Sequence, residues 1–466
     1  MSAGPTTLVW FRRDLRVADH PALRAAADAG PVVCLFVLDP ALLGRRHHRA
    51  PARLRFLRAG LEALDDALRA RGGRLVVRHG PPERIVPEVA AEAGARVVHF
   101  ARDVSPFARS RDARVAAALE EAGVRVRTMP ADLVAEPEEL PGSSGHGYRV
   151  FTPFHRAWRE AHIPEGVPAP RRVEGPEIGG EGVGRLPAGD PPLPAGPAAA
   201  RRRLAAFARD GLDGYPDRRD LVAEDATSRL SAYLRLGMCT PAQIGRALGL
   251  PGPLSGPWEA FWRQVCWRDF YHHHLARNPA VLRAAFQPAL RRVRWDDDPG
   301  GLAAWAAGET GYPLVDAGMR QLAGEAWIHN RARMAVASFL AKDLLVDWRR
   351  GETVFMQGLV DGDPASNNGG WQWTAGTGTD AAPYFRVLNP VRQARRFDPR
   401  GEYVRRHVPE LRRVPDDRIF EPWTMTAEEQ RAAGCRIGSD YPQPRVDHAE
   451  RRELALERYR EARGEG

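Results

Sequence analysis

Five short apolar runs, separated by stretches with helical periodicity, fill the first part of the chain. The runs are residues 6–11, 32–38, 75–77, 97–100 and 124–126. The intervening stretches include residues 51–70 and 109–121, and the first of these carries leucines at the spacing of one helix face: Leu54, Leu57, Leu61, Leu64 and Leu68. Strands that alternate with helices predict a doubly wound α/β domain, in which helices cover both faces of a parallel sheet. Ligands of such sheets bind at the carboxyl ends of the strands.

The composition changes after residue 131. Proline and glycine dominate between residues 162 and 197, which predicts a long irregular connection. From residue 198 onward the pattern is helical, and this part holds 10 of the 12 tryptophans. A charged closing helix is expected at residues 447–463. We therefore expect three parts, which are an α/β domain at 1–131, a Pro/Gly-rich connection at 132–197 and a mostly α-helical domain at 198–466.

The chain is basic, with 68 Lys and Arg against 59 Asp and Glu. Every basic residue except Lys342 is an arginine. Arginine binds phosphate oxygens with two parallel hydrogen bonds, so the bias is consistent with a polyanionic partner. GC-rich coding explains the same bias, since it favours Arg, Ala, Gly and Pro together. The charge by itself leaves both explanations open.

Cysteine spacing and hydropathy exclude several classes of protein. The four cysteines lie too far apart for a zinc site, a redox pair or a disulfide framework; they are Cys34, Cys239, Cys266 and Cys435. Residues 1–10 lack the pattern of a signal peptide, and no apolar stretch reaches about 18 residues. We expect a cytoplasmic monomer that binds no metal, enters no membrane and has no evident protein partner.

Two segments of the helical part carry residues suited to ligand binding. Residues 227–231 (TSRLS) offer hydroxyls and backbone N–H groups that could cradle a diphosphate, or they merely cap a helix. In residues 262–271, one helix face presents an amide, two aromatic planes and a cation; these are Gln264, Trp267, Arg268 and Tyr271. This face could hold an extruded base, or it belongs to a core helix with a salt bridge. The adjacent His272, His273 and His274 point in different directions, and we interpret them as helix surface.

Three later segments contain the most detailed pattern. Residues 327–334 include Arg333, which needs an anionic partner if it is buried. Residues 361–373 and 376–390 combine many glycines with the paired Asn367 and Asn368, which indicates backbone lying close to a ligand. The two aspartates at 361 and 363 lack the further ligands of a metal site.

Together with residues 9–16 (VWFRRDLR) and 421–423 (EPW), these segments resemble the DNA photolyase/cryptochrome flavoproteins over essentially the whole chain. The resemblance implies an N-terminal α/β antenna domain and a helical C-terminal domain that holds a U-shaped FAD. The class I cyclobutane pyrimidine dimer photolyases are the most similar subgroup, because Asn330 and Met334 stand where (6-4) photolyases carry histidines.

The resemblance also implies roles for individual residues. FAD binding is assigned to Tyr215, Thr227, Ser228, Arg229, Leu230, Ser231, Arg333, Asp361, Gly362, Asp363 and Asn367. Arg333 and Asp361 would form an ion pair beside the isoalloxazine. Asn367 would face flavin N5, where a neutral amide suits the reduced anionic form of FAD.

The implied activity is light-driven repair of cyclobutane pyrimidine dimers in UV-damaged DNA. Trp267 and Trp373 would sandwich the flipped dimer. Substrate and DNA contacts are assigned to Arg219, Gln264, Trp267, Arg268, Tyr271, Asn330, Arg331, Met334, Trp373 and Gln393. Electron transfer is assigned to Trp371, Trp348 and Trp295, together with Asn367.

The antenna pigment is expected at Phe36, Val37, Leu38, Asp103, Arg109 and Arg111. Folate-binding relatives carry an Asn-Glu pair before an Arg-x-Arg-Asp motif, whereas Phe107 and Ala108 stand there in this chain. The resemblance therefore favours 8-hydroxy-5-deazaflavin over methenyltetrahydrofolate, with an empty pocket as a third alternative.

Gln264 departs from the class I pattern, which has a glutamate at this position, and matches the (6-4) photolyases. An amide can hydrogen-bond a pyrimidine edge but supplies neither the charge nor the proton of a carboxyl group. The sequence therefore leaves two alternatives to dimer repair, which are (6-4) photoproduct repair and a cryptochrome-type blue-light photoreceptor.

Overall fold

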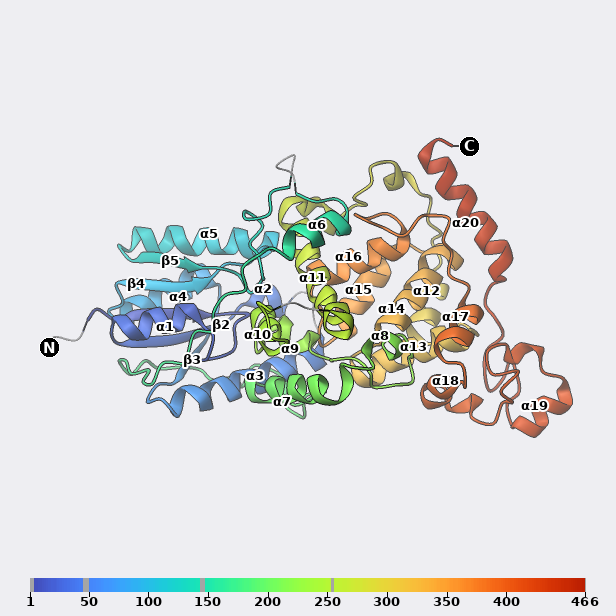
Figure 1. The fold of residues 1–466 in the computed structure, drawn as a ribbon, viewed down its shortest axis with the longest axis horizontal. Helices are drawn as coiled ribbons and strands as arrows, with labels where there is room; N and C mark the ends of the chain where they lie inside the picture. Colours follow the sequence, from blue (N-terminus) through green and yellow to red (C-terminus); the bar gives the residue numbers. More distant parts are fainter. Residues whose placement is uncertain (1–3, 45–49, 143–146, 253–254, 466) are drawn as a thin grey trace. The chain divides into compact units, whose positions relative to one another are not determined.

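The computed structural model describes residues 4–44, 50–142, 147–252 and 255–465 (Figure 1). The chain divides into two compact units, each built from separate stretches of sequence. The sheet unit comprises Met1–Asp213, Ser228–Pro279 and Val360–Ala365. The helical unit comprises Gly214–Thr227, Ala280–Leu359 and Ser366–Gly466.

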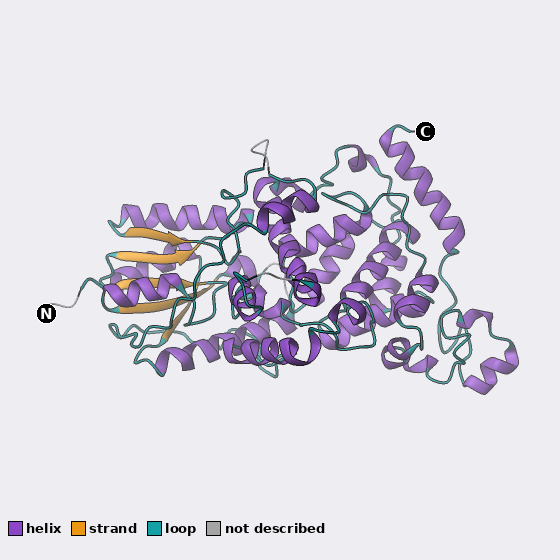
Figure 2. Cartoon of the chain, in the orientation of Figure 1, coloured by secondary structure: helices purple, strands orange, loops and turns teal. Residues whose placement is uncertain are grey.

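The sheet unit contains one five-stranded parallel sheet, coloured orange in Figure 2. Its strands are β1 (Thr7–Phe11), β2 (Val32–Leu38), β3 (Leu75–His79), β4 (Val97–Ala101) and β5 (Arg125–Met129). The spatial order is β3-β2-β1-β4-β5. The chain runs from β1 through β2 to β3 at one edge, returns to β4 beside β1, and ends with β5 at the other edge. The predicted parallel α/β architecture is therefore confirmed. The carboxyl ends of β1 and β4 form the switch point where such sheets bind ligands.

Helices cover both faces of this sheet. On one face, Leu8 and Trp10 of β1 join a core with Val86 of α4 (Pro82–Glu92) and Val115 of α5 (Pro106–Glu121). On the other face, the Phe11 ring lies 4.7 Å from His20, which caps α1 (Pro21–Ala29). The predicted leucine-rich helix is α3 (Pro51–Arg69), and it contacts β3. The short α2 (Pro40–Leu43) follows β2.

Strand β5 extends beyond its predicted apolar run, residues 124–126. It pairs with β4 through residues 125–129, and its side chains are exposed or half-buried. An edge strand needs no continuous apolar run because one of its sides faces solvent. Hydropathy therefore located the strand but not its end.

The Pro/Gly-rich connection lies along the sheet unit rather than away from it. Backbone hydrogen bonds join it to the rest of that unit, among them Asp19 N to Val167 O at 2.6 Å, Val32 N to Glu174 O at 2.8 Å, Val173 N to Arg71 O at 2.8 Å and Glu181 N to Val77 O at 2.8 Å. The connection also contains a helix that the sequence analysis missed, α6 (Phe151–Trp158).

The predicted helical character after residue 198 is confirmed. The sheet unit includes α7 (Pro197–Ala206), the π-helix η2 (Phe207–Gly211), α9 (Ser231–Arg235), α10 (Pro241–Ala247) and α11 (Gly256–Arg277). The helical unit includes α8 (Tyr215–Arg218), α12 (Pro299–Ala307), α13 (Pro313–Glu325), α14 (Asn330–Ser338), the π-helix η5 (Phe339–Asp343), α15 (Trp348–Gly358), α17 (Pro390–Phe397), α18 (Glu402–His407), α19 (Ala427–Ala433) and α20 (His448–Arg463). Helix α16 (Pro364–Ala375) begins in the sheet unit and continues in the helical unit. The closing helix α20 matches the predicted residues 447–463.

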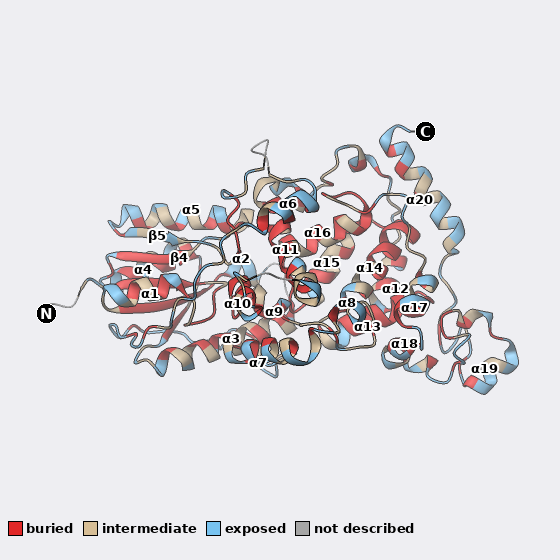
Figure 3. Ribbon diagram, in the orientation of Figure 1, coloured by how far each residue is buried: buried red, intermediate tan, exposed pale blue. Residues whose placement is uncertain are grey.

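The interpretation of His272, His273 and His274 as helix surface is wrong. All three are buried, and since successive helix residues point in different directions, α11 is buried on more than one face; Figure 3 shows the buried segments of α11 in red. One ring nitrogen of each of the first two has a partner inside the fold: His272 Nδ1 lies 2.8 Å from Arg268 O, and His273 Nε2 lies 2.8 Å from Ala135 O. Burial lowers the pKa of His274 to about 4. The three histidines are thus part of the core.

Lys342, the only lysine, lies in η5 with no exposed surface. Its Nζ donates a hydrogen bond of 2.9 Å to Arg386 O, and burial lowers its pKa to about 8. Among the residues that the structure describes, no helix is long and apolar enough to cross a membrane.

Candidate functional site

In the sheet unit, Gly362 and Asp363 are held by side chains from three separate places in the sequence. Asp363 lies 2.6 Å from Arg13 and 3.5 Å from His272, and Arg235 donates a 2.8 Å hydrogen bond to Gly362 O. Burial would raise the pKa of Asp363, but His272 and Arg13 hold that pKa well below its usual range. Asp363 also accepts a hydrogen bond from Ala365 N in the first turn of α16. The position of this loop is therefore fixed before any ligand binds.

The opening motif, residues 9–16, provides Arg13, which pairs with Asp363, and it forms several other ion pairs. Arg12 pairs with Asp112, Arg16 pairs with Asp132, and Asp14 lies 3.1 Å from His20. Burial opposes ionisation of Asp14, yet the neighbouring His20 lowers its pKa to about 2. The partners of this motif come from the N-cap of α1, from α5 and from the start of the connection.

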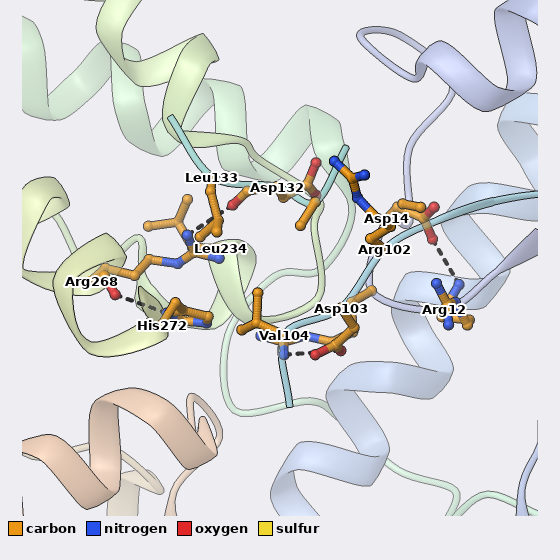
Figure 4. A pocket seen from close by; sticks show the side chains of 13 residues that line it. Arg12, Asp14, Arg102, Asp103, Val104, Asp132, Leu133, Leu234, Arg268 and His272 are labelled. Atoms are coloured by element: carbon orange, nitrogen blue, oxygen red, sulfur yellow. Dashed lines mark hydrogen bonds and ion pairs between the residues drawn. The ribbon is translucent and has the colours of Figure 1, made fainter. Parts of the chain in front are cut away.

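A pocket lies at the carboxyl ends of β1, β4 and β5 (Figure 4). Its lining is Arg12, Arg13, Asp14, Ala101, Arg102, Asp103, Val104, Ala131, Asp132, Leu133, Leu234, Arg268 and His272. This is the switch point of the sheet. Of the residues predicted for the antenna, Asp103 lines the pocket, and ion pairing with Arg13 lowers its pKa despite burial.

The other predicted antenna residues lie elsewhere in the sheet unit. Phe36, Val37 and Leu38 are the buried last residues of β2. Arg111 is buried with its guanidinium 5.0 Å from the Trp10 ring, whereas Arg109 is exposed. The structure therefore does not bring the six predicted residues into one pocket lining.

Residues 228–231 turn sharply before α9. Arg229 has a positive φ of 49°, and Leu230 follows in the right-handed helical region. A succession of left-handed and right-handed residues is one that anion-binding turns use, but here the Leu230 N–H donates to Ser228 Oγ at 3.4 Å. No hydroxyl of the run caps α9, since Leu230 occupies the cap position. The cap alternative for α9 thus lacks a side-chain hydrogen bond, and the cradle alternative stays a prediction.

The predicted face of α11 exists, and its four side chains are each half-buried. Trp267 stacks on Phe151 of α6, with centroids 3.7 Å apart and ring planes 1° from parallel. Tyr271 lies 5.5 Å from Trp267, and Gln264 donates to Ala260 O at 3.2 Å. Arg268 donates to Asp132 O at 2.8 Å. One face of the Trp267 indole is thus covered, and the other is not used by this stack.

In the helical unit, two asparagines of α16 are held by Glu352 of α15. Asn367 donates to the Glu352 backbone oxygen at 3.1 Å, and Asn368 donates to its Oε1 at 3.2 Å. Desolvation raises the pKa of Glu352 to about 7. Because the Asn367 amide nitrogen is bound in this way, its oxygen is the end left for a further partner.

Trp371 and Trp348 are both 2% exposed in the core of the helical unit, whereas Trp295 is partly buried beside it. The Trp371 ring lies 5.0 Å from Phe355 and 5.9 Å from Trp305, both in edge-to-face geometry. A Cβ at Gly351 would lie 2.2 Å from the Trp371 ring, so only glycine fits there. The fold encloses Trp371 tightly.

The remaining predicted residues of the helical unit differ in their surroundings. Asn330 is exposed at the start of α14, and Met334 one turn later is half-buried. Arg331 pairs with Asp220 at 2.7 Å, and Arg333 donates to Ile328 O at 2.9 Å. Tyr215 is buried, and three further residues are half-buried: Arg219, Trp373 and Gln393.

Comparisons with known proteins agree with this arrangement. The family described as "DNA photolyase" matches residues 7–172, and "FAD binding domain of DNA photolyase" matches residues 261–461. Proteins named deoxyribodipyrimidine photo-lyase from Streptomyces griseus and Halobacterium salinarum are 45% and 42% identical, over 98% of this chain and 99% of each relative. The chain belongs to the DNA photolyase family. The relative of the same name from Escherichia coli is 38% identical over the same shares.

Solved structures of the family share the fold. A bacterial class III photolyase from Agrobacterium tumefaciens aligns with a TM-score of 0.93 and 37% identity, covering 100% of this chain and 98% of that one. A Synechocystis cryptochrome aligns with a TM-score of 0.89 and 30% identity, covering 98% and 100%. The family contains both repair enzymes and cryptochromes, so the fold alone does not separate these functions.

The residues of this chain fit a flavin dinucleotide. In the described part of the chain, the buried Trp371 Nε1–H has no hydrogen-bond partner, and the Asn367 oxygen is left as an acceptor. The left-handed Arg229 followed by the right-handed Leu230 is a backbone succession found in anion-binding turns. These donors and acceptors are the groups that a ring system with N–H and carbonyl edges and a diphosphate would need.

Proposed function

We propose that this chain is a light-driven repair enzyme that splits cyclobutane pyrimidine dimers in DNA. The observation that carries the proposal is the half-buried Trp267 plane on α11, with Gln264, Arg268 and Tyr271 on the same helix face, in a chain with full-length photolyase relatives. An aromatic plane beside hydrogen-bonding groups suits a base that has left the duplex.

When bound, reduced FAD supplies the electron that light drives into the dimer. In the sheet unit, residues 361–363 and the turn at 228–231 would hold the flavin and its phosphates. In the helical unit, we also assign FAD binding to Tyr215, Thr227 and Arg333, and the Asn367 oxygen would accept a hydrogen bond from a flavin N–H. Since Glu352 fixes the other end of that amide, Asn367 needs no rearrangement to accept it.

The substrate would be held by stacking and by phosphate contacts. Trp267 stacks on one side of the dimer and Trp373 on the other, while Gln264 hydrogen-bonds its edge. Arg219, Gln393, Asn330, Arg331 and Met334 would contact substrate or DNA backbone. Phosphate contacts give affinity without lesion preference, whereas the stacking rings give the preference.

Trp371, Trp348 and Trp295 would relay electrons from an external reductant to oxidised flavin, which must take up two electrons and one proton to reach the reduced anionic form. Indole rings suit this step because they lose an electron more readily than other neutral side chains. The enclosed position of Trp371 and Trp348 keeps water away from them. This route lies outside the repair cycle, so it matters only for enzyme that has become oxidised.

For the antenna we propose 8-hydroxy-5-deazaflavin, held near Asp103 and the end of β2 in a domain of residues 1–131. Residues 132–197 would connect it to the flavin domain of residues 198–466. A Sulfolobus tokodaii photolyase structure, 31% identical, is described as holding two FAD molecules. The extracted pigment of the purified protein identifies the antenna directly.

The deciding experiment illuminates the reduced protein with two DNA substrates, one with a defined cyclobutane dimer and one with a (6-4) product. Repair of the dimer alone is expected. Turnover of the (6-4) product alone would instead support the alternative that Gln264 suggests. Flavin photochemistry without any repair would support a cryptochrome-type photoreceptor.

A further inference from the structure

Phe151 contacts the ring that the proposed function uses to stack on the lesion. It is 1% exposed at the first position of α6, within the predicted connection of residues 132–197. Its ring and the Trp267 indole lie face to face, 3.7 Å apart and 1° from parallel. In the part of the chain that the structure describes, the other two ring contacts of Trp267 are not parallel: Phe270 lies at 85° and Tyr271 at 38°.

The orientation of an indole is not fixed by its own covalent geometry. The second side-chain torsion of tryptophan has broad minima, so a half-buried ring can rotate unless neighbours restrict it. A ring packed face to face restricts that rotation, because tilting either plane would bring atoms of the two rings closer than van der Waals contact. Phe151 therefore determines the plane that Trp267 presents.

Phe151 is itself held rigidly. Phe270 packs edge-on against it at 5.7 Å and edge-on against Trp267 at 5.6 Å, so one ring braces both members of the stack. The Arg263 guanidinium lies 5.1 Å from the Phe151 ring, one turn before Trp267 on α11. His155, one turn along α6, lies 5.6 Å from Phe151 at 17°.

We propose that Phe151 is a positioning residue for lesion recognition, which fixes the plane of Trp267 and leaves its opposite face for the extruded dimer. The proposal rests on the proposed function, since it assumes that Trp267 stacks on the lesion. It extends the recognition site to α6. It also predicts that lesion preference depends on a residue that touches no DNA.

The test compares Phe151→Leu with Phe154→Leu, a matched control. Phe154 lies on the same helix and is also 1% exposed, but its ring contacts are Tyr148, Phe270 and His273. For each FAD-loaded variant, the ratio of dissociation constants for undamaged duplex and for the same duplex with one cyclobutane dimer is measured at one salt concentration. FAD content and thermal midpoint are measured alongside.

We expect Phe151→Leu to lower the ratio about fivefold, which is the lower end of the loss expected when base stacking is removed. Binding of undamaged duplex and FAD content should stay unchanged. Phe154→Leu should keep the wild-type ratio at a similar loss of thermal stability. An unchanged ratio in Phe151→Leu, or an equal loss in both variants, would overturn the proposal.

A double-mutant cycle separates this proposal from the proposed function. In a Trp267→Ala background, Phe151→Leu should change the ratio no further, because it acts through the missing indole. If Trp267→Ala alone keeps the ratio, the assumed role of Trp267 fails. If Trp267→Ala lowers it and Phe151→Leu does not, only the positioning role fails. Should Phe151→Leu fold poorly, Phe151→Met replaces it with the same expected outcomes.

Discussion

Two tryptophans with proposed roles are held in opposite ways by the fold. Trp371 in the helical unit is almost fully buried, with Phe355 and Trp305 packed edge-on around it. Trp267 in the sheet unit is half-buried and rests face-on against the single parallel neighbour Phe151. One ring is enclosed from every side, and the other is supported from behind.

The difference follows from what each ring is asked to do. A ring that relays an electron must stay near its neighbours and away from water, which burial provides. A ring that binds a base must keep one face accessible, and so it needs rigid support on the other face. Trp371 and Trp267 therefore differ in burial as their proposed roles require, whereas Trp295, the third residue assigned to the relay, is only partly buried.

Replacing the enclosed ring should give the largest effect. In Trp371→Phe, photoreduction of oxidised flavin should stop, because phenylalanine is far harder to oxidise than indole. Repair by chemically reduced enzyme should continue. Absorbance under illumination with an external reductant measures the first, and dimer turnover after chemical reduction measures the second.

Trp305→Phe is the control for this variant, because Trp305 contacts Trp371 and is equally buried, but has no assigned role. It should keep photoreduction while losing the hydrogen bond from its Nε1 to Val336 O. Loss of photoreduction in this variant would show that the electron also passes through Trp305.

Replacing the supported ring should affect DNA recognition instead. Trp267→Ala should remove lesion preference, since stacking contributes about 1–3 kcal/mol per base. Arg219→Ala should weaken binding to damaged and to undamaged DNA by the same factor, and it should reduce the salt dependence of that binding. Titrations at several salt concentrations distinguish the two. If both variants lost only lesion preference, the division between stacking and phosphate contacts would be wrong.

Gln264→Glu should sharpen the role of the α11 face. Glutamate cannot donate the hydrogen bond that Gln264 makes to Ala260 O, so the side chain becomes free to meet the substrate as a charged acceptor. We expect more repaired dimers per absorbed photon, with FAD content unchanged. A yield at or below that of the wild type would argue against an acceptor role at this position.

Gly351→Ala tests the enclosure of Trp371. The new methyl group would meet the indole at 2.2 Å, and overpacking of this kind costs about 1–3 kcal/mol. Gly324→Ala on α13 is the control, because a Cβ there has open space around it. In urea unfolding, the free energy of unfolding should fall for Gly351→Ala and stay unchanged for Gly324→Ala. Equal stabilities would mean that the ring can move aside.

Glu352→Gln should give the smallest effect, visible as a pH dependence. Desolvation raises the pKa of Glu352 from 4.5 to about 7, so the folded state holds its proton more tightly than the unfolded chain. The wild type should therefore lose stability relative to the variant as pH rises from about 4.5 to about 7. Thermal midpoints of both proteins across this range provide the measurement, and a pH-independent difference would contradict the assignment.

The sequence predicted those parts of the fold that repeat locally. Apolar runs located all five strands, and leucine spacing located α3, because both patterns arise within a few residues. It failed where burial depends on distant elements: His272–His274 look polar, yet α11 is covered on several sides. Helix α6 was missed because prolines and glycines surround it.

For the candidate site, the resemblance supplied residue types but no partners. The pairing of Arg13 with Asp363 joins positions 350 residues apart, and no periodicity reveals it. Phe151 was overlooked for the same reason, since its importance lies in the 3.7 Å contact with a helix far along the chain. The roles of Arg235 and Glu352 likewise depend on backbone carbonyls and amides that a sequence does not display.

The burial of Lys342 has a practical consequence for chemistry performed on this protein. Every other basic side chain is a guanidinium, which succinimidyl esters and acetylating reagents do not acylate under mild conditions. In the folded chain such reagents should modify the α-amino group but not Lys342, whose amine has no exposed surface. The extent of acylation at Lys342 would then measure the fraction of molecules that have unfolded around it, which makes the lone lysine an internal probe of unfolding.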